Sequence, residues 1–146
     1  MMMVDHHPET PSGPTNLLVS TGQTRRPCRW VDALATRLQP RGVAVRQADT
    51  GRQAIRIVEE GGISLVILDA ETPQLDGLSA LRIIRSIDRA LPCLLVAENP
   101  SGYVIRQALA LQAYSVVAEP VDEGLLMDVV TRIFRTVYDQ DFPAIG

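Results

Sequence analysis

The sequence has little cysteine, few aromatic residues, no lysine and no long apolar run. Its two cysteines, Cys28 and Cys93, are too few for a disulfide framework, and they predict a reducing, cytoplasmic setting. No apolar run approaches the ~20 residues that a membrane span needs, so we expect no membrane partner. A net charge of −3 argues against a nucleic-acid-binding surface, which would need clustered lysine and arginine. The first residues lack the layout of a signal peptide. These absences leave one globular domain of ordinary composition.

One stretch, residues 65–77, organises the chain and reads LVILDAETPQLDG. Four apolar residues lead directly into Asp69, and polar residues and a proline follow. A short, unbroken apolar run of this kind predicts a strand buried on both faces of a parallel sheet. Asp69 then lies at the carboxyl end of the strand, where open α/β sheets place their ligands.

Apolar runs and helical periodicities alternate along the rest of the chain. Strands are predicted at residues 16–20, 64–69, 93–97 and 115–118, and one more strand is predicted to begin at residue 43. Helices are predicted at 27–39, around 54–58, at 77–88, 103–112 and from a cap at Asp122 to about 138. This pattern predicts the α/β class, with a doubly wound, five-stranded parallel sheet flanked by five helices. Residues 1–15 are predicted to be a disordered tail, 16–138 the domain, and 139–146 a short second tail.

The spacing Asp69-x-x-x-Pro73-x-x-Asp76-Gly77 after an apolar strand resembles the phosphoacceptor region of response-regulator receiver domains. Further similarity lies at 48–54, 92–96 and 113–120, in the family's order over about 16–138. The resemblance implies a flavodoxin-like fold with strand order 2-1-3-4-5. It also implies a phosphoacceptor at Asp69, served by a histidine kinase and Mg²⁺.

The same resemblance implies helper residues that this chain lacks. An acid pair after the first strand is replaced by Ser20 and Thr21, and a Ser or Thr after the fourth strand by Ala97. The lysine after the fifth strand is replaced by Glu119, and the aromatic switch residue by Val116. These departures predict a degenerate pocket with no metal, no cofactor and no catalytic residue. The chain is therefore not expected to be an enzyme.

Physical chemistry supports that expectation, because Mg²⁺ prefers several oxygen ligands that include carboxylates. Only Asp69 would remain as a charged ligand. Two like charges about 4 Å apart, such as Asp69 and Glu119, would repel by roughly 4 kcal/mol at an effective dielectric of about 20. Arg25 or Arg26 could supply a compensating cation, although an exposed arginine pair is the simpler expectation. We expect Glu119 to point to solvent.

Two groups of apolar residues exceed what a single helix face needs, and they predict a partner surface. The first is Tyr103, Ile105 and Leu109 in the fourth helix, and the second is Met127, Phe134 and Tyr138 in the fifth. In receiver domains this region is the usual site of dimerisation and partner docking. The alternative is that these side chains pack against loops or tails.

The sequence thus predicts a degenerate receiver that acts as a phosphorylation-independent interaction module in bacterial signalling, with a protein partner or a homodimer. The first alternative is a receiver still phosphorylated on Asp69, with Mg²⁺ as its cofactor. The second is a flavodoxin-like domain that binds a small ligand, although no glycine-rich phosphate loop supports it.

Overall fold

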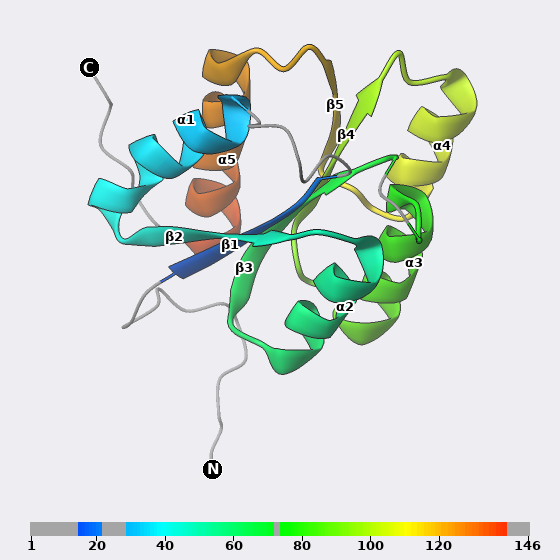
Figure 1. The fold of residues 1–146 in the computed structure, drawn as a ribbon, viewed down its shortest axis with the longest axis horizontal. Helices are drawn as coiled ribbons and strands as arrows, with labels where there is room; N and C mark the ends of the chain where they lie inside the picture. Colours follow the sequence, from blue (N-terminus) through cyan, green and yellow to red (C-terminus); the bar gives the residue numbers. More distant parts are fainter. Residues whose placement is uncertain (1–14, 22–28, 72–73, 140–146) are drawn as a thin grey trace.

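The protein folds as a five-stranded parallel sheet between two layers of helices in the computed structural model (Figure 1). The structure describes residues 15–21, 29–71 and 74–139. The strand order is β2-β1-β3-β4-β5, which confirms the predicted topology. The strands are β1 Thr15–Ser20, β2 Val43–Ala48, β3 Ile63–Asp69, β4 Cys93–Glu98 and β5 Ser115–Glu119.

Five α-helices connect and follow the strands, as predicted. They are α1 Arg29–Leu38, α2 Gly51–Glu60, α3 Gly77–Ile87, α4 Gly102–Ala110 and α5 Glu123–Tyr138, with a short 3₁₀ helix, Gln39–Arg41, after α1. Four helices begin at a residue whose side-chain oxygen accepts a backbone N–H three residues later, as good N-caps do. These caps are Thr50, Asp76, Ser101 and the predicted Asp122.

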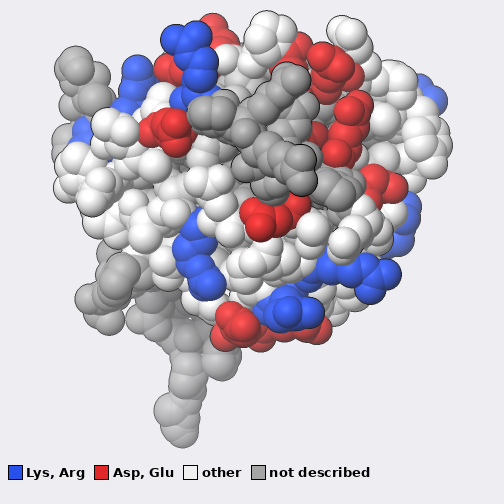
Figure 2. Space-filling model, in the orientation of Figure 1, with Lys and Arg blue, Asp and Glu red and all other residues white. Residues whose placement is uncertain are grey.

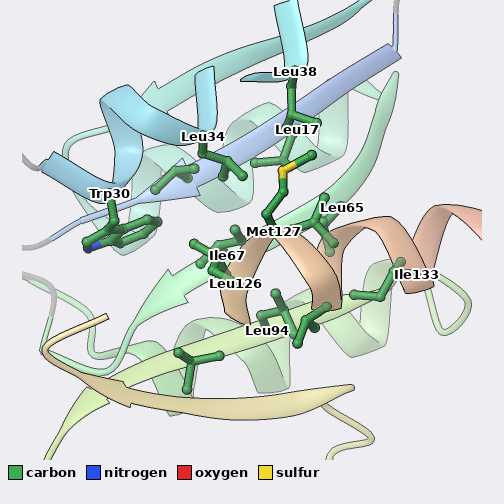
Figure 3. Close-up of a cluster of buried hydrophobic side chains, with 14 of the residues drawn as sticks. Leu17, Trp30, Leu34, Leu38, Leu65, Ile67, Leu94, Leu126, Met127 and Ile133 are labelled. Carbon is green, nitrogen blue, oxygen red and sulfur yellow. The ribbon is translucent and has the colours of Figure 1, made fainter. Parts of the chain in front are cut away.

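The two faces of the sheet carry separate hydrophobic cores. Helices α1 and α5 cover one face and α2, α3 and α4 cover the other (Figure 1). The first core joins α1 and α5 to the sheet through residues such as Leu34, Ile67 and Ile133 (Figure 3). The second joins α2, α3 and α4 to the sheet through residues such as Ala54 and Leu81. Because β1, β3 and β4 are covered on both faces, their sequences are almost uninterrupted apolar runs.

The outermost elements of the described structure are β1 and α5. Thr15 belongs to β1 rather than to the predicted tail, and its N–H donates to the Gly42 carbonyl at 3.2 Å. Asp139 ends α5 in the left-handed conformation. The remainder of both predicted tails lies outside the described residues. Within the described ranges, no helix combines the length and apolar composition of a membrane span.

Candidate functional site

Asp69 is the last residue of β3 and lies at the carboxyl edge of the sheet, as predicted. Its side chain is half-buried. One carboxylate oxygen, Oδ1, accepts the backbone N–H of Glu71 at 2.9 Å. The next residue, Ala70, donates its N–H to the Val96 carbonyl of β4 at 2.8 Å. The carboxylate therefore closes a tight turn at the end of the strand, and the backbone beneath it is fixed to the sheet.

The connection from β3 to α3 passes very close to Asp69. The N–H of Gly77 donates to the Ala70 carbonyl at 3.1 Å. A Cβ atom on Gly77 would lie 2.5 Å from the Asp69 carbonyl oxygen, so only glycine fits this approach. Asp76 accepts the N–H of Ser79 at 2.8 Å and caps α3, which begins at residue 77 as predicted. Pro73 lies outside the described residues.

The positions that replace the family's acid pair and hydroxyl are closed off from solvent. Ser20 is fully buried, and Thr21 and Ala97 are nearly so. Among the described residues, the Ser20 hydroxyl finds no hydrogen-bond partner. These three residues offer no charge to a ligand at this edge. Val116, the predicted switch position, is half-buried against the core on the α2–α4 side.

Glu119 is the last residue of β5 and is half-buried, whereas the sequence predicted that it points to solvent. Its strand pairs with β4 up to this residue, where it lies opposite Glu98. Burial raises the pKa of the Glu119 carboxyl, and the negative charges of Asp69, Glu98 and Glu71 raise it further. Among the described residues, every charge that shifts this pKa is negative. Acidic side chains gather on the upper right of Figure 2, near the ends of β4 and β5 in Figure 1.

This donor set does not fit the Mg²⁺ ion that the family resemblance implies. Within the described ranges, no group of three or more His, Cys, Asp or Glu side chains is arranged to hold a metal ion. Residues 22–28, which follow β1, contain neither Asp nor Glu. Arg25 and Arg26 lie outside the described residues, so the expectation that this pair is exposed stays a prediction.

The predicted partner surface divides into two parts. Tyr103, Ile105 and Leu109 on α4 are exposed, at 59%, 37% and 53%. We call these three residues the α4 surface. Arg106 is the only charged residue in this helix. Tyr114, which follows α4, is also exposed and was missed, although it lies within residues 113–120, the segment that resembles the family's fifth strand.

The other half of the prediction, on α5, was wrong. Phe134 is fully buried and Met127 is 6% exposed, and both belong to the core on the α1–α5 side. Figure 3 shows Met127 pointing into that cluster. Tyr138 is half-buried, its hydroxyl donates to the Ser64 carbonyl at 2.6 Å, and its ring lies 5.7 Å from that of Phe134. The reason is that α5 lies across the sheet beside α1, so a wide stripe of its surface is covered.

Comparisons with known proteins agree with this architecture. The family model described as "Response regulator receiver domain" matches residues 29–131. The chain is 27% identical over 106 residues to the transcriptional regulatory protein ZraR of Escherichia coli, covering 71% of this chain and 24% of that protein. It is 29% identical over 92 residues to the transcriptional activator ExaE of Pseudomonas putida, covering 63% of this chain and 43% of that protein. The chain therefore spans less than half the length of these relatives.

Solved structures show the same fold at low sequence identity. The signal receiver domain of an HD domain-containing protein from Pseudomonas fluorescens superposes with a TM-score of 0.75 and 20% identity, over 87% of this chain and 99% of that one. The Vibrio cholerae chemotaxis protein CheY4 superposes with a TM-score of 0.70 and 18% identity, over 83% of this chain and 99% of that one.

Proposed function

The chain belongs to the response regulator receiver family of two-component signalling, and we propose that it acts there as a degenerate receiver, without phosphorylation of Asp69. The observation that carries this proposal is the place of Glu119, a half-buried carboxylate at the end of β5 that lies opposite Glu98. The position that the family gives to a cation holds a partly buried anion instead. The proposed setting is the cytoplasm, with a protein partner and no nucleic acid.

The chemistry of phosphoryl transfer explains why this one position matters. Transfer depends on positioning and on neutralising the charge of the phosphoryl oxygens. Asp69, Glu71, Glu98 and Glu119 all contribute negative charge at this edge. A phosphoryl group on Asp69 would add further negative charge where no described side chain offsets it. The proposed module therefore works without Mg²⁺ and without catalysis.

The proposed working surface is the α4 surface. Its three apolar side chains project from a helix whose only charged residue is Arg106. Isolated exposed apolar residues are ordinary, but three on one short helix favour contact with another protein. The occupant that we propose is a signalling partner or a second copy of the chain.

A receiver that is still phosphorylated is the competing function, and one observation favours it. Asp69 keeps its place at the carboxyl end of β3, and its side chain is only half-buried. Binding of a small ligand, the remaining alternative, gains no support here, because Ser20 and Ala97 at this edge are buried.

Beryllofluoride, a phosphoryl mimic, separates the two functions. We expect amide resonances near residues 69 and 97 to show no saturable shift when Mg²⁺ and beryllofluoride are added to the native chain. A variant carrying Ser20→Asp, Thr21→Asp, Ala97→Thr and Glu119→Lys restores the family's groups, and it serves as the positive control. Saturable shifts in the native chain that disappear in Asp69→Asn would overturn the degenerate assignment.

A further inference from the structure

Helix α4 is attached to the domain by fewer buried residues than any other α-helix of the described structure. Only Ala108 is buried in it, whereas each of the other four α-helices buries at least four residues. Few buried apolar contacts mean a low free energy of local opening. The packing of its side chains therefore contributes little to holding α4 in place.

Both ends of α4 are bounded by residues in an unusual backbone conformation. Asn99, before the helix, has a φ of 45°, and Gln112, after it, has a φ of 62°. Side-chain-bearing residues adopt this left-handed region at a cost, so something must hold the chain there. At the start of the helix, Ser101 Oγ accepts the N–H of Val104 at 3.2 Å. At its end the N–H of Ala113 donates to the Ala108 carbonyl at 2.9 Å, and further support comes from another helix.

That support is the Arg85 guanidinium of α3. Its Nε donates to the Leu111 carbonyl at 2.8 Å and its Nη2 to the Gln112 carbonyl at 3.0 Å. Its Nη1 donates to the Leu91 carbonyl at 2.6 Å and to the Asp88 carbonyl at 3.2 Å. One side chain thus binds the carbonyl groups after α4 and those of the connection from α3 to β4.

A guanidinium suits this role because it presents several N–H donors in a fixed plane. Carbonyl groups at a helix C-terminus have no partners within the helix and favour a nearby positive charge. All four acceptors of Arg85 are backbone carbonyls. No lysine or shorter side chain could reach them together with the same geometry.

We propose that Arg85 is the positioning residue for α4: it fixes the C-terminal end of the helix, and without it α4 opens locally while the sheet stays intact. The position of the α4 surface then depends on a residue outside it. This inference goes beyond the proposed function, because it concerns the isolated domain and holds whether or not a partner binds.

Amide hydrogen exchange followed by mass spectrometry tests the proposal on the full chain. In Arg85→Ala we expect amides at 102–114 to exchange at least about tenfold faster, since several charge-assisted hydrogen bonds are lost. Amides of β3 and β4 should exchange at the native rate. Arg82→Ala is the matched control, because Arg82 is an exposed arginine of the same helix and should leave every rate unchanged.

The outcomes are distinct. Unchanged exchange at 102–114 would overturn the proposal, and so would an equal increase across all strands, which would make Arg85 a general stabilising residue. If Arg85→Ala does not fold, Arg85→Lys decides the question. Lysine keeps the charge but offers a single donor group, so the rate at 102–114 should still rise, and a native rate there would overturn the proposal. None of these results depends on the response to beryllofluoride.

Discussion

Glu98 and Glu119 lie directly opposite each other on β4 and β5, at the carboxyl edge of the sheet. Like charges in paired positions destabilise a sheet, and Asp69 and Glu71 add to the repulsion. The chain therefore keeps an arrangement that reduces its own stability. Local conflicts of this kind are expected where a site has been shaped by function rather than by folding.

Glu119→Gln should stabilise the protein at neutral pH. Because the folded pKa of Glu119 is raised above its ordinary value of 4.5, the folded state binds the proton more tightly than the unfolded state. The carboxylate therefore costs stability above the folded pKa, and that cost disappears as the pH falls towards 4.5. We expect a gain of about 0.5–1 kcal/mol at pH 7 by urea denaturation, shrinking as the pH is lowered. Glu59→Gln, at an exposed site on α2, is the control. A Glu119→Gln variant that is no more stable than the native protein at pH 7 would contradict the argument.

Gly77→Ala should destabilise the domain, because the new Cβ would lie 2.5 Å from the Asp69 carbonyl oxygen and 2.8 Å from the Ala70 Cα. We expect a loss of at least ~2 kcal/mol in the free energy of unfolding. Gly124→Ala, in the first turn of α5, provides the opposite control. Its Cβ meets only Asp122 Oδ1, at 3.4 Å, and alanine should stabilise the helix by up to about 1 kcal/mol. Equal effects from the two substitutions would show that the close approach at Gly77 is unimportant.

Cys93 should be chemically inert in the folded protein. Burial raises the pKa of its thiol to about 11, and the nearby Arg85 charge offsets only part of this. The reactive thiolate is therefore scarce at pH 8, and reagents cannot reach it. In a Cys28→Ser variant, we expect no labelling by a thiol reagent at pH 8 until denaturant is added. Rapid labelling of the native variant would show that β4 is more open than the structure indicates.

Tyr138→Phe should remove one partly buried hydrogen bond and little else. The hydroxyl of Tyr138 joins the end of α5 to the start of β3 through the Ser64 carbonyl. Losing it should cost about 1 kcal/mol, measured by urea denaturation. Tyr103→Phe, at an exposed site on α4, should change stability by less than about 0.5 kcal/mol.

Leu109→Asp tests the α4 surface as a docking site. The side chain is 53% exposed, so the change should leave the fold intact and weaken self-association or partner capture. Sedimentation over a range of concentrations measures the first, and Ile83→Asp on α3, also exposed, is the control. Phe134→Asp would not test this surface, because Phe134 is fully buried in the core. Identical sedimentation of both variants and the native chain, together with native partner capture, would count against this surface.

The fold could be predicted from the sequence because its apolar runs have strand length and its helices carry clear caps. The site was predictable where it depends on which residues end the strands. Asp69 and Glu119 each end a strand of a parallel sheet, so they lie at the same edge. The buried face of α5 was not predictable. Leu125, Leu126 and Met127 are consecutive apolar residues, and only the packing against α1 decides that the first is exposed and the other two are buried.

The role of Arg85 could not be predicted from the sequence, for a different reason. Its partners are four backbone carbonyls, which every residue possesses, so no pattern of residue types marks them. An arginine on a helix is ordinarily expected to be solvated.

The place of α5 in the chain also has a consequence for synthesis on the ribosome. Leu17, Leu65 and Leu94 lie on the sheet face that α5 covers, and α5 is made after all five strands. Until its residues emerge, much of that face has no cover, and a nascent chain in this state is prone to aggregate. The exposed face should therefore keep the nascent domain dependent on chaperones until α5 has been made and can cover it.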